Sequence, residues 1–238
     1  MKTIRWGMIG CGDVTEVKSG PGFYKAENST LLGVTNRTLS KAQSYAQRHN
    51  IPRVYPDAEA LLADPEIDIV YIATPPAEHT ALTLLAAAAG KHVYVEKPMA
   101  MNHAECETMI AACQAAGVRL FVAFYRRAMP RFLQVKNWID GGAIGTVCMV
   151  SVLQRQRPTP AELSPETLPW RLKAEVAGGG KFLDMGVHVL DALSFWFGPI
   201  TAVHGEASNR GGLYGVEDTV TASWQHASGV SGTGNWCY

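Results

Sequence analysis

Short apolar runs alternate with amphipathic segments over the first half of the chain. The runs are almost continuously apolar, which is typical of strands covered on both faces of a parallel sheet. They occupy residues 3–10, 30–36, 68–74, 92–98 and 119–125. Helical periodicity fills the intervals at residues 40–50, 57–65, 77–90 and 102–117. This succession predicts a doubly wound parallel α/β sheet in residues 1–124, with ligands bound at the carboxyl ends of its strands.

The pattern changes after residue 124. An amphipathic helix, a strand-like run and a proline-rich loop are followed by a glycine turn that opens another helix, and then by alternating strands. These segments cover residues 130–145, 146–157, 157–170, 178–198, 200–208, 218–227 and 230–238. The order predicts a second domain at residues 125–238, of α+β class, with a mainly antiparallel sheet.

Composition narrows the kind of partner. Among 238 residues, 21 Lys and Arg balance 21 Asp and Glu, which removes any general case for nucleic acid or anionic membrane. The longest apolar region, residues 79–95, contains Gly90 and Lys91 and is too short to span a bilayer. The N-terminus has no secretory pattern, and five cysteines without a CxxC pair indicate reduced thiols. We therefore expect a cytoplasmic protein that binds a small molecule.

A glycine turn follows the first strand directly. Gly10 permits a tight bend, and Gly12 lets the backbone approach a pyrophosphate at the start of the next helix. Thr15 stands where the third glycine of the dinucleotide fingerprint is expected, so the motif alone is a weak signal. Its position in a βαβ unit favours a dinucleotide site of the Rossmann kind. The predicted contact residues are Gly10, Cys11, Gly12, Asp13 and Val14.

The end of the second strand bears on the choice of cofactor. Enzymes that prefer NAD place an acidic residue there for the ribose hydroxyl groups. This chain has Asn36, Arg37 and Thr38, which offer a cation and hydrogen-bond donors to a 2′-phosphate. The pattern favours NADP over NAD. The alternative is that Arg37 is a solvated residue at a helix start.

Two later strands end at the same predicted edge of the sheet. Thr74, Pro75 and Pro76 form a rigid turn, and His79 lies on the helix that follows. Taken alone this is an ordinary proline turn, but a rigid wall at the carboxyl end of a strand also suits packing against a cofactor ring. Pro76 and His79 are therefore included among the predicted cofactor contacts. Glu96 and Lys97 end the following strand. A lysine at this edge can face a bound ligand, or it can be a charge at the point where the strand reaches water.

The second domain carries another group of polar residues. Asp184, His188 and Asp191 are spaced by four and three residues, which places them on one face of an α-helix. His188 can act in chemistry or be a core histidine, and no further ligand supports a metal. Arg171 beside Trp170 can bind a phosphate or a sugar hydroxyl, or it can form a surface ion pair. Tyr125 and Arg126 lie where the chain leaves the first domain and are predicted substrate contacts.

Taken together, the motifs resemble the glucose–fructose oxidoreductase and inositol dehydrogenase (Gfo/Idh/MocA) family over nearly the whole chain. The matching stretches are GCGDV, ATPPAEH, VEKP, FYRR and GGGKFLDMGVHVLD, in this order. The resemblance implies a Rossmann domain followed by an α+β domain, and hydride transfer between a nicotinamide cofactor and a sugar or cyclitol. It also implies a shortened C-terminal sheet, which puts the family's oligomer interface on that sheet in doubt.

The resemblance assigns roles to particular residues. Lys97 matches the catalytic lysine, Pro98 its cis proline, and Asp184 with His188 the acid–histidine pair. Residues matching those that line the nicotinamide ribose are Thr74, Pro75, Glu96 and Lys97, and Trp170–Arg171 is similar to a motif of NADP-using members. Lys97 can then polarise the substrate oxygen while His188 carries the proton. Two alternatives remain: a non-catalytic cofactor-binding sensor, and a cofactor-assisted glycosidase or lyase.

Overall fold

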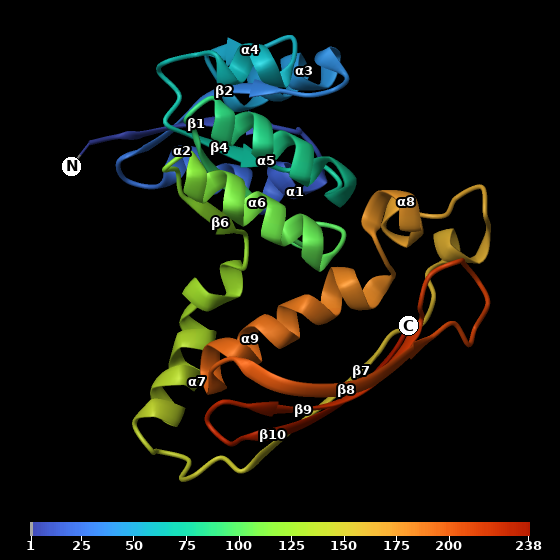
Figure 1. Ribbon diagram of the computed structural model, residues 1–238. Helices are drawn as coiled ribbons and strands as arrows, with labels where there is room; N and C mark the ends of the chain where they lie inside the picture. The colour runs from blue at the N-terminus through green and yellow to red at the C-terminus, as the bar shows by residue number, and fades with distance from the viewer. Residues whose placement is uncertain (1) are drawn as a thin grey trace. The chain divides into compact units, whose positions relative to one another are not determined.

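The computed structural model describes residues 2–238. They form two units, one ending at Ala123 and the other running from Phe124 to Tyr238. Each unit has its own sheet and its own hydrophobic core. Figure 1 labels most of the helices and strands of both units.

Six parallel strands form the sheet of the first unit. They are β1 (Ile4–Ile9), β2 (Ser29–Thr35), β3 (Arg53–Val54), β4 (Ile69–Ile72), β5 (His92–Val95) and β6 (Leu120–Val122). Their order is β3-β2-β1-β4-β5-β6, so the winding direction reverses between β1 and β4. The predicted doubly wound parallel sheet is confirmed. Strand β3 was not expected, because two residues leave no periodicity to detect.

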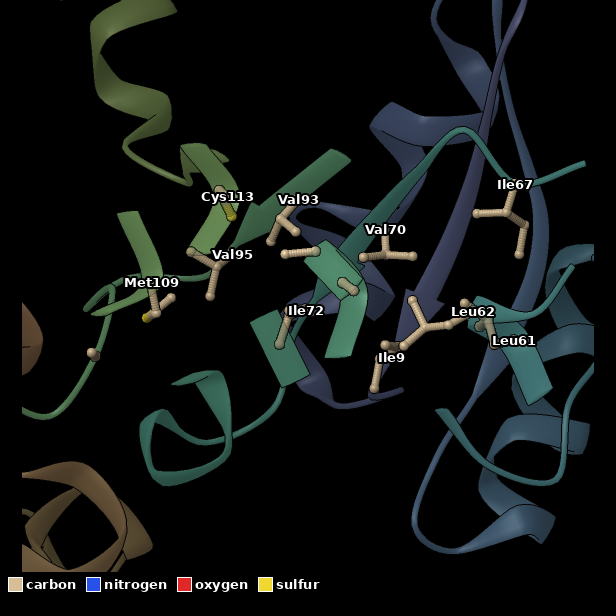
Figure 2. Close-up of a cluster of buried hydrophobic side chains, with 13 residues drawn as sticks. Ile9, Leu61, Leu62, Ile67, Val70, Ile72, Val93, Val95, Met109 and Cys113 are labelled. Carbon is tan, nitrogen blue, oxygen red and sulfur yellow. The ribbon is translucent and has the colours of Figure 1, made fainter. Parts of the chain in front are cut away.

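Helices cover both faces of this sheet. They are α1 (Asp13–Val17), α2 (Gly20–Lys25), α3 (Leu39–His49), α4 (Ala58–Leu62), α5 (His79–Ala88) and α6 (His103–Ala115). Consecutive strand residues point to opposite faces. Thus Ile9, Ile72 and Val95 join the core that contains residues of α4, α5 and α6, shown in Figure 2. Met8 and Tyr71 join the core built with α2 and α3 on the other face.

Local sequence explains the helix boundaries of this unit. Asn102 begins α6, because its side-chain oxygen accepts the Glu105 N–H at 3.0 Å and its amide donates to the Glu105 carboxylate at 2.9 Å. Helix α1 ends at Val17, and the chain restarts as α2 with Pro21 in its first turn. Gly20 and Pro21 are the first two residues of α2, and proline is tolerated in the first turn of a helix because its missing N–H would have no partner there.

A four-stranded mixed sheet forms the base of the second unit. Its strands are β7 (Met149–Arg155), β8 (Ile200–Ser208), β9 (Thr219–His226) and β10 (Ser231–Cys237), in the order β7-β10-β9-β8. The pairing of β10 with β7 is parallel and the other two pairings are antiparallel, which confirms a mainly antiparallel sheet. Leu193 and Phe197 share one core with Trp224 and Trp236 of the sheet.

The helical segments of the second unit are mostly short. They are the 3₁₀ turns η2 (Tyr125–Ala128), η3 (Pro160–Leu163) and η4 (Trp170–Leu172), the π turn η5 (Phe182–Gly186), and the α-helices α7 (Pro130–Asp140), α8 (Ala174–Ala177) and α9 (Val187–Phe197). Helix α9 lies over the sheet in Figure 1. Within residues 2–238, no helix combines the length and the apolar character needed to cross a bilayer.

The prediction that Asp184, His188 and Asp191 lie on one regular α-helix after the glycine turn is wrong at the start of that helix. Residues 182–186 form a π turn, and the α-helix begins only at Val187. Because a π turn is wider than an α turn, Asp184 does not share a common α-helical face with His188 and Asp191. π turns inside helices are frequent at functional sites, where they change the direction of a side chain.

Candidate functional site

The glycine turn after β1 gives its two glycines different tasks. Gly10 has φ +102°, and a Cβ at this position would lie 2.8 Å from the Ala73 carbonyl oxygen, so the turn requires glycine. A Cβ at Gly12 would meet no heavy atom within 4 Å in the described part of the chain. Gly12 therefore leaves open space beside the backbone where α1 begins. This space fits the approach of a phosphate group.

Two side chains at the glycine turn, Thr15 and Cys11, are directed toward backbone carbonyl oxygens of the protein. Thr15 replaces the third glycine of the motif, and its hydroxyl donates to the Gly12 carbonyl oxygen at 2.7 Å. The Cys11 thiol is buried and points toward the Thr35 carbonyl oxygen at 3.7 Å, and burial raises its pKa to about 12. Asp13 and Val14 are the first residues of α1. Cys11 can therefore contact a ligand through its backbone but not through its side chain.

An ion-pair cluster holds α1 against α3. Arg48 donates two hydrogen bonds of 2.6 Å to the Glu16 carboxylate, and His49 Nε2 lies 2.9 Å from the same group. The hydrogen bond from Arg48 lowers the pKa of Glu16 to about 2. The carboxylate therefore stays ionised and keeps the helix that follows the glycine turn in place.

The segment after β2 forms a small turn with an exposed cation. The Asn36 side-chain oxygen accepts the Thr38 N–H at 2.9 Å, and Thr38 precedes the first residue of α3. Arg37 is exposed to solvent at this carboxyl end of β2. The arrangement leaves a guanidinium group at the end of the strand.

His79 links the loops that follow β4 and β5. Its ring is completely buried, with Nε2 at 2.9 Å from the Thr74 carbonyl oxygen and Nδ1 at 3.0 Å from that of Pro98. Burial lowers its pKa. A buried ring has no surface for a cofactor, so we assign His79 the task of holding the two loops. Pro75 and Pro76 lead from the first of these loops into α5.

Glu96 is held from two sides at the end of β5. The Tyr71 hydroxyl lies 2.5 Å from Oε1, and the Lys97 backbone N–H donates to Oε2 at 3.2 Å. The Lys97–Pro98 peptide bond is cis, as the resemblance implies. The sequence does not mark Tyr71 as a site residue, because it lies inside an apolar strand, where only its hydroxyl group distinguishes it from a core residue.

In the second unit, the structure brings Asp184 together with the Trp170–Arg171 pair. Arg171 Nε lies 3.7 Å from Asp184 Oδ2, and the guanidinium group lies 4.4 Å from the centroid of the Trp170 ring. The sequence motif and the acid of the π turn therefore form one polar cluster. Asp191 has a separate task, since it accepts hydrogen bonds from Arg127, the shortest of 2.6 Å.

His188 lies at the start of α9 among aromatic rings. It is 7% exposed, with the Tyr125 ring centroid at 5.5 Å and that of Phe124 at 6.2 Å. Tyr125 is about half exposed. The guanidinium group of Arg126 lies 5.8 Å from the Phe132 ring, so Arg126 is directed toward α7. Of the two predicted substrate residues in this segment, Tyr125 is the one beside His188.

Two glutamates, Glu162 and Glu217, hold the start of the π turn, and no sequence motif marks either of them. Lys181 donates to Glu162 Oε2 at 2.6 Å, and both side chains are less than 10% exposed. The Gly180 N–H donates to Glu217 Oε1 at 2.8 Å. Burial alone would raise the pKa of Glu162, but hydrogen bonds from Lys181 and Thr159 bring it below its usual value. The turn that carries Asp184 is thus anchored by a buried ion pair.

Comparison with known proteins decides the family. Residues 4–124 match the oxidoreductase family with an NAD-binding Rossmann fold, and residues 132–238 match the GFO/IDH/MocA C-terminal domain. The chain belongs to the Gfo/Idh/MocA oxidoreductase family. The family and the fold predicted from the sequence motifs are therefore confirmed.

Individual members are similar along nearly the whole chain. Oxidoreductase P35 of Formosa agariphila is 37% identical over 98% of this chain and 72% of its own length. The aldose–aldose oxidoreductase of Caulobacter crescentus, solved with glycerol, has a TM-score of 0.89 at 30% identity, with 100% of this chain and 71% of that chain covered. Levoglucosan dehydrogenase, solved with NADH and levoglucosan, has a TM-score of 0.84 at 28% identity, with 98% and 66% covered.

Proposed function

We propose that this Gfo/Idh/MocA protein transfers a hydride between a nicotinamide cofactor and a hydroxyl or carbonyl group of a sugar, cyclitol or related polyol. One observation carries the proposal: the glycine turn after β1 and Lys97 after β5 lie at the carboxyl ends of parallel strands of one sheet. The aldose and levoglucosan enzymes named above support the substrate class.

We place the dinucleotide against the backbone of residues 10–14, where Gly12 leaves open space. Further contacts are proposed from Asn36, Arg37, Thr38, Thr74, Pro75, Pro76, Glu96, Lys97, Trp170 and Arg171. When bound, the cofactor donates or accepts the hydride. The protein's part is to bind it, orient it and manage charge and proton at the substrate.

Lys97 and His188 are the residues we propose for the chemistry. A lysine ammonium group stabilises the negative charge that develops on a substrate oxygen. An imidazole can take or return the hydroxyl proton near neutral pH. Asp184 orients the substrate or His188, and Tyr125 and Arg126 are proposed substrate contacts. The experiment that tests the function is a fluorescence titration with NADPH and NADH, followed by an assay of cofactor oxidation with a panel of sugar and cyclitol carbonyls.

The two glycines of the turn yield a matched pair of variants. We expect Gly12→Ala to leave the thermal stability unchanged, because the added methyl group meets open space, while weakening cofactor binding by ~10-fold or more through loss of close backbone approach. Gly10→Ala should instead destabilise the protein, because φ is positive and the Ala73 oxygen is too close. Cofactor titration and thermal unfolding separate the two. Equal cofactor affinity of Gly12→Ala and the wild type would contradict the placement.

Arg37 is the residue we propose to select NADP. Because a charge-assisted hydrogen bond contributes ~1.5–3 kcal/mol, Arg37→Ala should weaken NADPH binding by about 10- to 100-fold. NADH binding should change little, since NADH lacks the 2′-phosphate. Arg131→Ala removes an exposed cation from α7 and is the control. A parallel loss of both cofactors in Arg37→Ala would rule out the selective role.

A further inference from the structure

Tyr71 makes an unusual contact for a residue in the middle of a buried strand. It belongs to β4 and is completely buried, with ring centroids of Phe23 at 4.7 Å and Tyr94 at 5.5 Å. Its hydroxyl nevertheless reaches the Glu96 carboxylate at 2.5 Å. A hydroxyl donating to a carboxylate is a short, strong type of hydrogen bond. The ring of Tyr71 is thus packed in the apolar core, while its hydroxyl group reaches a carboxylate at the end of β5.

Ser19 completes the arrangement from the junction between α1 and α2. Its Oγ lies 2.8 Å from the Tyr71 hydroxyl oxygen. Tyr71 has a single proton, and the carboxylate is the stronger acceptor, so the phenol donates to Glu96. The Ser19 hydroxyl has one proton for two acceptors, the phenol oxygen at 2.8 Å and the Val14 carbonyl oxygen at 3.1 Å. Burial and the charge of Glu96 raise the pKa of Tyr71, which keeps the donor protonated. Ser19 and Tyr71 therefore tie the segment after the glycine turn to the segment that carries Lys97.

We propose that Tyr71, supported by Ser19, is a positioning residue for Glu96 and Lys97. With Oε1 held by Tyr71, the carboxylate directs Oε2 at the Lys97 backbone N–H, 3.2 Å away. The Lys97 peptide is thus fixed from its amino side by Glu96, while the ring of His79 lies 3.0 Å from the Pro98 carbonyl oxygen on the other side. This proposal rests on the proposed function, because it requires that Lys97 takes part in the reaction.

The test compares Tyr71→Phe with Tyr94→Phe. Each variant removes one hydroxyl oxygen from the same aromatic cluster, but only the first removes the bond to Glu96. We expect the Lys97 amide of Tyr71→Phe to exchange with solvent ~10-fold faster by NMR in the protein without cofactor, since a hydrogen bond to a charged group is lost. In the presence of substrate, kcat should fall by ~10-fold with little change in KM, because misplacing a reacting group costs rate more than binding.

Ser19→Ala should shift both quantities in the same direction by a smaller factor, and Tyr94→Phe should shift neither. The positioning role is overturned if the amide exchange of Tyr71→Phe matches that of Tyr94→Phe. It is also overturned if kcat falls equally in both variants, because the loss then follows from packing alone. Amide exchange is measured without turnover, so it tests the positioning of Lys97 independently of any activity. Full activity of Lys97→Met would instead contradict the proposed function.

Discussion

We expect Lys97→Met to lower kcat by about 10²–10³-fold, the cost of removing one preorganised donor from a developing oxyanion. Methionine keeps a stem as long as the apolar part of lysine but lacks the ammonium group. The position itself is well fixed, because Glu96 accepts the Lys97 N–H and the Pro98 carbonyl oxygen lies beside His79. The loss should therefore come from the missing ammonium group and not from a rearranged loop. Steady-state kinetics with a substrate found in the carbonyl panel measures it.

Lys41→Met is the matched control for this prediction. Lys41 is an exposed residue of α3, and its substitution removes the same charge from the same unit. We expect wild-type kcat for Lys41→Met, and wild-type thermal stability for both variants. NADPH affinity of Lys97→Met should stay within about threefold of the wild type, since most of the dinucleotide is bound by the backbone at the glycine turn. A Lys97→Met protein with normal kcat would remove Lys97 from the reaction.

The second large effect concerns stability. Lys181→Met should destabilise the protein by ~3–5 kcal/mol, because it leaves the Glu162 carboxylate buried without its cation. Adding Glu162→Leu should recover most of this loss, since replacing both partners of a buried ion pair by apolar residues is often neutral. Urea unfolding of the wild type, the single variant and the double variant measures the free energies. A single variant as stable as the wild type would show that the pair is not buried in solution.

The same pair predicts a dependence on pH. The pKa of Glu162 is lowered in the folded protein, so its contribution to stability is present above the unfolded-state pKa of about 4.3 and is lost as pH falls through the folded-state value. Lys181→Met removes the cation that contributes most to lowering the pKa of Glu162, while burial continues to raise it. The folded-state pKa of Glu162 should therefore be higher in the variant than in the wild type. The single variant should then lose less stability than the wild type on acidification.

Much of the fold could be predicted from the sequence because the relevant signals are local. Apolar runs of strand length mark β1, β2, β4 and β5, and the Asn102–Glu105 spacing marks the start of α6. The glycine turn and the strand end at Lys97 follow from the same pattern. The parallel sheet then places both at its carboxyl edge without any knowledge of distant contacts.

The parts that could not be predicted depend on tertiary contacts. The π turn at residues 182–186 is anchored by Glu162 and Glu217, which lie far from it in sequence, so helical periodicity alone suggested a regular α-helix. In the sequence, Tyr71 is indistinguishable from a core residue, because it lies in an apolar strand. That its hydroxyl reaches Glu96 depends on how β4 and β5 pair in the folded sheet. His79 was expected to contact the cofactor, and its complete burial between two loops depends on the fold around it.

The most direct test of the account is a single-turnover measurement with NADPH carrying deuterium at C4 of the nicotinamide. The protein is mixed with this cofactor and a panel of sugar and cyclitol carbonyls, and the products are analysed by mass spectrometry. We predict that deuterium appears on the carbon that becomes the carbinol, at a rate at least ~100-fold lower in Lys97→Met and in His188→Ala. Transfer at the wild-type rate in both variants would contradict the account.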